Sequence, residues 1–319
     1  MRPTIFHAVL PWLAALCLCS AAQAFTPYGS PVAFNRPGSA DTQLWDINDA
    51  GTVVGWSTQG AFSYANGVFS AVNVPVPDVN VFATGITNGG VIVGAYERQD
   101  ANAILVQRGF ILDGANFTSF DLPGADFTAI RHVSSDGRYL SGTWSDGLGK
   151  AGGFAFDRQT ATATRILNDP SYTGVIAQGV NVHGQVTGSF LRHRFNGQSN
   201  SGAFIFDLHT NTWVETLNVA GQTRPRFRDI NDDGVITGWV GVNAFVGRPG
   251  DWFFFNGDSS RNLSGYGLNN HGVAVGFAFG AAGLVSGELF NPVPEPATEM
   301  LLALGLGLGG LMLARRRRS

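Results

Sequence analysis

The 319-residue sequence is poor in cysteine, in lysine and in charge. Its two cysteines, Cys17 and Cys19, both lie within the first 24 residues, and charged residues make up only 13% of the chain. If those 24 residues are removed, the remaining chain has neither disulfides nor thiol chemistry. The five histidines beyond this segment show no paired metal-ligand spacing, so the sequence predicts no metal site.

Residues 25–296 also lack clustered positive charge. Residues 25–296 hold 15 Lys+Arg and 22 Asp+Glu, a net charge of −7, and Lys150 is the only lysine. Nucleic-acid binding needs a basic patch, so this composition argues against it. Apolar residues make up 44% of the chain, which excludes a disordered composition, and 43 glycines and 24 phenylalanines favour an all-β domain with many tight turns.

Catalytic motifs are absent as well. No Gly-x-Ser-x-Gly elbow or phosphate-binding loop occurs, and the Asn231–Gly234 turn lacks the distal glutamate of a calcium-binding EF-hand. A glycosidase would need two opposed carboxylates, which sequence alone cannot pair. We therefore predict no catalytic residue and no cofactor.

The first 24 residues have the features of a secretory signal peptide. Arg2 supplies a positive start, residues 8–19 are apolar, and Ala22-Gln23-Ala24 has the small-x-small pattern of a cleavage site. The alternative is a retained anchor helix, which the short apolar run disfavours.

The C-terminus combines a short motif, an apolar run and a basic tail. The motif is Val293, Pro294, Glu295 and Pro296, residues 300–314 are apolar, and the tail is Arg315, Arg316, Arg317 and Arg318. As a helix, the apolar run would span roughly 22 Å, short of a bilayer core of about 30 Å, and adding residues 297–299 brings it near the lower limit for crossing. The basic tail would stay cytoplasmic, which places the rest of the chain outside.

This order resembles the PEP-CTERM sorting signal of Gram-negative bacteria. The resemblance implies processing by an exosortase-type enzyme, a transient inner-membrane anchor during export, and a final place at the cell surface or in an extracellular matrix. The alternative is a plain single-pass anchor, in which the prolines only end the helix. The resemblance covers the tail alone and implies no activity for the rest of the chain.

One phrase repeats six times between the two ends. It reads Ile47-Asn48-Asp49-Ala50-Gly51-Thr52-Val53-Val54-Gly55-Trp56 at its first appearance. The turn glycines of the six copies are Gly51, Gly90, Gly137, Gly184, Gly234 and Gly272. A period near 44 residues matches a four-stranded propeller blade. The Asn/Asp step and a glycine at positive φ make a hairpin turn, and the second glycine of the phrase indicates a bulge or a close backbone approach.

A second hairpin follows each phrase, but the sixth copy lacks its fourth strand. The segment 32–38 resembles the end of a fourth strand, so we predict that it completes the sixth sheet and closes the ring. The predicted fold is thus an all-β, six-bladed β-propeller over residues 25–291, between a signal helix (1–24) and a sorting signal with a transmembrane helix (292–319). A β-solenoid is the alternative. The repeats also resemble the degenerate HAF-type repeats of PEP-CTERM proteins.

One face of such a ring would carry the Asn/Asp-Gly turns, and the other the loops of variable length, which suit binding. These loops are expected at residues 97–108, 145–152, 191–201 and 240–250. An aromatic residue follows the second glycine of every copy and is a candidate for stacking against sugars. These residues are Trp56, Tyr96, Trp144, Phe190, Trp239 and Phe277. The alternative is that they pack between blades. Two basic groups together are candidates for a positive patch that binds acidic polysaccharide. They are Arg192, His193 and Arg194, expected in one variable loop, and Arg224, Arg226 and Arg228, expected in a link between blades. The alternative is a solvated loop face.

The sequence therefore predicts an exported, non-enzymatic binding or structural protein associated with exopolysaccharide or with neighbouring surface proteins. Two alternatives stay open. One is a secreted propeller hydrolase or lyase acting on polysaccharide, and the other is a spacer without a small ligand.

Overall fold

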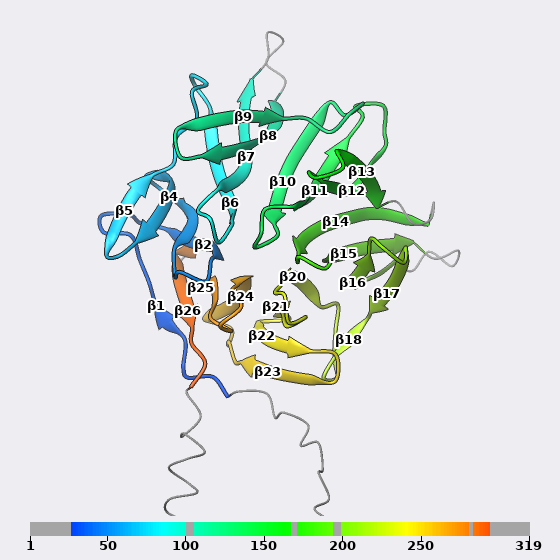
Figure 1. The fold of residues 1–319 in the computed structure, drawn as a ribbon. Coiled ribbons are helices and arrows are strands. Elements are labelled where there is room, and N and C mark those ends of the chain that lie inside the picture. Colours follow the sequence, from blue (N-terminus) through cyan, green and yellow to red (C-terminus); the bar gives the residue numbers. More distant parts are fainter. Residues whose placement is uncertain (1–26, 100–104, 167–170, 194–198, 281–282, 294–319) are drawn as a thin grey trace, which may run out of the picture.

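Six four-stranded antiparallel sheets form a closed ring around a central channel (Figure 1). The computed structural model describes residues 27–99, 105–166, 171–193, 199–280 and 283–293. The predicted six-bladed β-propeller is confirmed. The predicted signal helix and transmembrane helix lie outside the described residues. Among the described residues there is no helix of the length and hydropathy that crossing a membrane requires.

The four strands of each blade follow one another from the channel to the rim of the ring. In that order, blade one is β2 (Thr42–Ile47), β3 (Val53–Ser57), β4 (Gly60–Ala65) and β5 (Val68–Ala71). Blade two is β6 (Asn80–Ile86), β7 (Ile92–Gln99), β8 (Leu105–Asp113) and β9 (Asn116–Phe120). Blade three is β10 (Phe127–Val133), β11 (Tyr139–Ser145), β12 (Ala151–Asp157) and β13 (Thr162–Ile166).

Blade four is β14 (Tyr172–Val180), β15 (Gln185–His193), β16 (Ser199–Asp207) and β17 (Thr212–Thr216). Blade five is β20 (Arg226–Ile230), β21 (Ile236–Val240), β22 (Asn243–Arg248) and β23 (Asp251–Phe255). Blade six is β24 (Arg261–Leu268), β25 (Ala274–Gly280), β26 (Val285–Phe290) and β1 (Val32–Ala33). A small hairpin, β18 (Asn218–Val219) with β19 (Gln222–Thr223), links blades four and five.

The N-terminal strand closes the ring, as predicted. β1 pairs with β26 through Val32 opposite Leu289 and Ala33 opposite Glu288. The Phe34 N–H continues this pairing by donating to the Gly287 carbonyl at 2.8 Å. The sixth sheet therefore contains strands from both ends of the chain, which satisfies the edge of β26.

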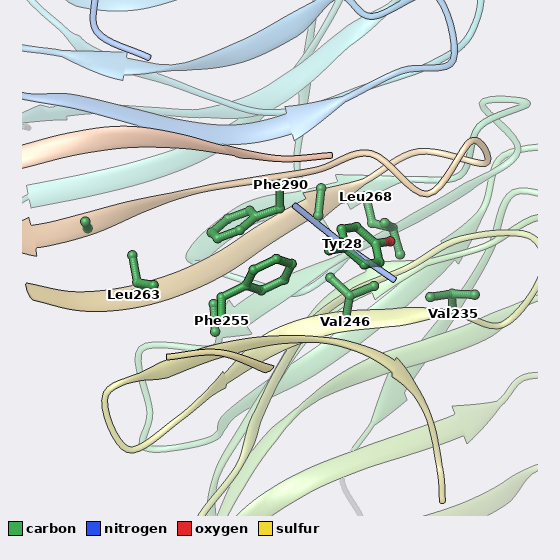
Figure 2. Packing of buried hydrophobic residues seen from close by; sticks show 10 residues of the cluster. Tyr28, Val235, Val246, Phe255, Leu263, Leu268 and Phe290 are labelled. Atoms are coloured by element: carbon green, nitrogen blue, oxygen red, sulfur yellow. The ribbon is translucent and has the colours of Figure 1, made fainter. Parts of the chain in front are cut away.

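The hydrophobic core lies between neighbouring blades. In the described part of the chain, each buried apolar cluster combines side chains from two adjacent sheets. Figure 2 shows the cluster between blades five and six, where Tyr28 packs beside Phe255 and Phe290. Since a single sheet of this kind cannot bury both of its faces, each blade depends on its neighbours for stability.

The repeated phrase forms the turn between the first and second strand of each blade, and its six turn glycines all have positive φ. We call the end of the ring that holds these turns the turn face, and the opposite end the loop face. The phrase asparagines also join blades. Each donates from its side-chain amide to a carbonyl of the next blade at 3.0–3.1 Å: Asn48 to Thr87, Asn181 to Asn231, Asn231 to Asn269, and Asn269 to Asn48.

The prediction for blade five is wrong by one strand. The segment 240–250, expected to be a variable loop, contains β22, so the loop between the second and third strands shrinks to Gly241 and Val242. Asp251–Phe255, which would be the third strand if 240–250 were that loop, is therefore the fourth. Gly241 has φ +60°, which permits so tight a turn.

Candidate binding site in the central channel

Every innermost strand bulges at the same point, and the bulge turns one side chain into the channel. The strand register shifts by one or two residues opposite the second glycine of each phrase, for example between Leu44 and Asp46 opposite Gly55. A Cβ on Gly55 would lie 2.1 Å from the Gln43 carbonyl oxygen, so this close approach requires glycine, as predicted. The bulge residues are Trp45, Thr84, Arg131, Gln178, Arg228 and Tyr266.

The bulge residues line a cavity of about 140 Å³, which we call the channel pocket. Its lining consists of these six residues with Gln43 and His132. The innermost strands run toward the turn face, and Gln43 is the second residue of β2. Turn residues such as Asn48 and Asn269 line a separate cavity and do not line the channel pocket. The channel pocket therefore lies on the loop-face side of the channel.

The residue after each bulge follows a strict alternation around the ring. The six positions are Asp46, Gly85, His132, Gly179, Asp229 and Gly267. Each glycine makes room for the polar residue of the next blade. A Cβ on Gly179 would lie 2.6 Å from the Asp229 Cα, and one on Gly267 would lie 2.5 Å from the Asp46 Cα.

The three polar side chains meet on the axis and form the floor of the channel pocket. The His132 Nε2 atom lies 3.3 Å from the Asp46 Oδ2 atom and 3.2 Å from the Asp229 Oδ1 atom. All three residues are buried. The Nε2 atom lies between the carboxylates without a well-directed hydrogen bond to either of them.

Each floor residue also joins its blade to the next one. The Asp46 carboxylate accepts from the Ile86 N–H at 2.7 Å, and the Asp229 carboxylate accepts from the Leu268 N–H at 2.8 Å. The His132 Nδ1 atom faces the Val180 N–H at 3.4 Å. The floor thus repeats one inter-blade contact at blades one, three and five.

Burial and charge attraction shift the pKa values of the floor residues His132 and Asp46 in opposite directions. Burial alone lowers the pKa of His132, but the Asp229 and Asp46 carboxylates outweigh it and hold the pKa well above its ordinary 6.5. Burial raises the pKa of Asp46, and His132 offsets only part of that rise. The floor therefore holds its protons more tightly than the same groups would in water.

The floor residues are of types that bind divalent cations, and their three ligand atoms lie within 4.8 Å of one another. If the His132 Nε2 atom bound a metal, the ring proton would have to sit on Nδ1. The Val180 N–H already points at Nδ1, so a proton on that atom would face another donor. The carboxylates also accept backbone N–H groups. These contacts fit a hydrogen-bonded plug better than a metal centre.

Two arginines form the positive wall of the channel pocket. Arg228 donates to the Tyr266 hydroxyl at 2.9 Å, and its guanidinium lies 4.2 Å from the Tyr266 ring centroid and 4.5 Å from that of Trp239. Burial lowers the pKa of Arg228 to about 10, and Arg131 contributes to that shift. Burial also lowers the pKa of Arg131. Both side chains stay charged at neutral pH.

Most of the six predicted aromatic candidates pack in the core. Tyr96, Trp144, Phe190 and Phe277 are at most 7% exposed. Trp144 donates from its indole to the Gly153 carbonyl, and the Arg165 guanidinium lies 3.9 Å from its ring centroid. These surroundings favour packing over ligand binding for the four residues.

Trp56 and Trp239 are only half-buried, so their ligand-binding role stays a prediction. Trp239 stacks on Tyr266 with 5.6 Å between ring centroids and thereby adjoins the channel pocket.

The predicted arginine group is divided among different environments. Arg226 and Arg228 belong to the innermost strand β20 and not to a link between blades, which corrects the prediction. Sequence reasoning missed Arg131 and the floor residues. The alternation of Asp, Gly, His, Gly, Asp and Gly, one position before the aliphatic residue of each phrase, was the available signal.

Comparisons with known proteins bear on the two parts of the chain separately. Residues 292–318 match the PEP-CTERM protein-sorting motif. The chain therefore carries the signal of exported proteins that an exosortase sorts to the cell surface, as predicted. Val293 is the one residue of the predicted motif within the described part, and its N–H donates to the Pro27 carbonyl at 2.7 Å. Pro294, Glu295, Pro296 and the four terminal arginines lie outside it.

Among the similar solved structures, YjhT supports the fold, and the fold alone. YjhT is 11% identical with a TM-score of 0.51, over 83% of this chain and 98% of its own. A gluconolactonase from Xanthomonas campestris is 12% identical with a TM-score of 0.46, over 84% and 97%. TolB from Acinetobacter baumannii is 14% identical with a TM-score of 0.43, over 80% of this chain and 64% of its own, less than two thirds of its length. No curated protein matches the sequence.

Proposed function

We propose that the mature chain is a non-enzymatic binding module at the cell surface or in the extracellular matrix, and that it holds exopolysaccharide at the loop face. The observation that carries this proposal is the position of the channel pocket relative to the sorting tail. β26 ends on the turn face, where the Tyr28 hydroxyl donates to the Gly272 carbonyl, so the tail leaves from that face. The channel pocket is on the opposite side.

The walls of the channel pocket suit a saccharide. Trp45 offers an aromatic ring, and Gln43 and Gln178 offer amides that can pair with hydroxyls. Tyr266 also lines the pocket, but its ring already packs against Trp239 and Phe277. Together these features supply stacking area and directional contacts within one concave site.

A propeller hydrolase or lyase is the alternative function, because Asp46 and Asp229 both face the axis. Glycosidase carboxylates must reach the scissile bond. In this ring both are at most 2% exposed, and backbone N–H groups occupy them. Their burial supports a role within the plug. Release of reducing ends from the exopolysaccharide by the purified chain would argue for the enzyme.

Binding of exopolysaccharide from the producing cells to the mature chain tests the proposal. We expect Trp45→Ala and Trp239→Ala to weaken binding at least about fivefold, since loss of aromatic stacking costs about 1 kcal/mol or more. Val214→Ala is the matched control, because Val214 is 57% exposed on the outer strand β17. Absence of binding by the folded wild-type chain would contradict the proposal and leave a spacer role.

A further inference from the structure

Arg131 and Arg228 present charge to the channel pocket from two different blades. Arg131 is the bulge residue of β10 in blade three, and Arg228 is that of β20 in blade five. Both line the same cavity of about 140 Å³. The two strands therefore fix where both side chains enter the pocket, and Arg228 is also held by its hydrogen bond to the Tyr266 hydroxyl.

Neither arginine forms an ion pair with an acidic side chain among the described residues. The ion pairs there involve other arginines, such as Arg138 with Asp157 and Arg261 with Glu288. The Arg131 Nε atom is buried without a hydrogen-bond partner. Arg228 is satisfied only by a neutral hydroxyl and by two aromatic rings.

Two partly buried cations without an ion pair are costly, because each loses hydration and has no carboxylate in contact. Among the described residues, the Glu97 carboxylate acts on the pKa of Arg131 from a distance but forms no ion pair with it. Burial lowers the pKa of both guanidiniums, which records this cost. Removing the cost calls for an anion from outside the chain. The floor beneath the pocket cannot supply it, because Asp46 and Asp229 are engaged with His132 and with backbone N–H groups.

We propose that the channel pocket binds the carboxylate of an acidic sugar, with Arg131 and Arg228 as the anion-binding residues. The planar guanidinium fork matches a carboxylate in two parallel hydrogen bonds. The sugar ring lies against Trp45, and the amides of Gln43 and Gln178 meet its hydroxyls. This inference deepens the proposed function and rests on it.

The size of the channel pocket restricts which part of a polymer enters it. A cavity of about 140 Å³ is smaller than the 300–1,000 Å³ typical of pockets for larger ligands. The floor also blocks passage through the channel. A terminal or branch uronic acid residue therefore fits, whereas an uninterrupted chain threading the ring does not.

Calorimetric titration of the mature chain with free hexuronates provides the test. We expect saturable binding of glucuronate or galacturonate that weakens as salt rises, and no binding of glucose. Arg131→Gln and Arg228→Gln should each lower the affinity at least about tenfold, and Arg131→Lys, which keeps the charge but loses the fork, should lower it less. Arg248→Gln is the control, because Arg248 is exposed and donates to the Asp233 carbonyl on the turn face. Thermal unfolding of each variant establishes that it is folded.

The outcomes separate this inference from the broader proposal. Exopolysaccharide binding without hexuronate binding would overturn the inference and leave the proposed function standing. Hexuronate binding without exopolysaccharide binding would support the inference and overturn the proposed function. Sulfate binding as tight as hexuronate binding would overturn the carboxylate assignment, and so would unchanged hexuronate affinity in folded Arg131→Gln and Arg228→Gln.

Discussion

The six residues that follow the bulges decide how the middle of the ring is filled. Three of them are glycines that lie against the backbone of the following blade, and the other three are Asp46, His132 and Asp229. If all six carried side chains, the axis could not hold them at the observed backbone separation. The alternation therefore produces a plug with approximate threefold symmetry inside a ring of six repeats.

Gly179→Ala should destabilise the fold by about 3 kcal/mol, the upper end for overpacking, because the new Cβ meets the backbone of Asp229 and Ile230 at under 3.0 Å. Gly174→Ala on the same strand is the matched control, since its nearest contact is the Leu191 Cβ at 3.7 Å. Urea unfolding of both variants measures the difference. Equal stability of the two would show that the inner strands can separate at little cost.

His132→Ala should leave Asp46 and Asp229 facing each other in a buried site, at a cost of about 3–5 kcal/mol near neutral pH. His271→Ala, at an exposed turn position, is the control. A variant as stable as the wild type at neutral pH would contradict the described floor.

The wild-type chain should lose stability as the pH rises. The folded pKa of His132 is raised above 6.5, so the folded state holds the proton more tightly than the unfolded state. That contribution is complete below about pH 6.5 and disappears as the pH rises through the folded pKa. Unfolding free energies measured across this range should fall in the wild type and in His271→Ala, but not in His132→Ala.

The sequence predicted the local chemistry of the turns and not that of the channel. The turn glycines could be predicted because positive φ is a property of one residue and its neighbours. Arg131 and Asp46 could not be placed on the axis, because the bulges interrupt the alternation of faces along each innermost strand.

β1 is the shortest strand in the six blades, and yet it closes the ring. Its two paired residues are exposed, so its contribution comes from its backbone and from Tyr28 just before it. The Tyr28 ring packs against Phe253 and Phe255 of blade five, with centroids 5.5 and 5.3 Å away. The N-terminal segment therefore joins two blades rather than one.

Tyr28→Ala should cost about 3–5 kcal/mol, because it removes a buried ring from the interface between blades five and six. Tyr28→Phe should cost about 1 kcal/mol through loss of the hydrogen bond to the Gly272 carbonyl. Val32→Ala serves as control, since Val32 is 52% exposed. Unfolding midpoints that stay the same in all three variants would show that ring closure does not limit stability.

Closure was predictable because the sixth repeat lacked a strand that the N-terminus could supply. The strand order of blade five was not predicted, since its third and fourth strands are joined by a turn at Gly250 that carries no Asn/Asp-Gly signal. Periodicity identified the blades, but the length of one tight turn decided which segment filled which position.

At the scale of the whole molecule, the two faces of the ring differ in their relation to the ends of the chain. Both described ends lie on the turn face, where the Val293 N–H donates to the Pro27 carbonyl. Exposed apolar side chains, such as Leu148 at 91% and Leu284 at 59%, lie on the loop face. A chain held by its tail would present the loop face outward.

Site-specific labelling on intact cells measures this orientation. The chain beyond residue 24 has no cysteine, so Leu148→Cys on the loop face and Ala50→Cys on the turn face each introduce a single thiol. We expect a bulky, impermeant maleimide to label Leu148→Cys several-fold faster than Ala50→Cys while the tail is attached. In the purified chain both thiols should react at similar rates. Faster labelling of Ala50→Cys on cells would reverse the proposed orientation.

The exit of the tail from β26 also determines how the ring bears mechanical load. A pull on the tail acts along the length of β26, which is held by β25 on one side and by β1 on the other. The hydrogen bonds on both sides are then loaded together in shear, rather than opened one after another. A matrix protein joined in this way resists flow through the strand pairing that closes its ring.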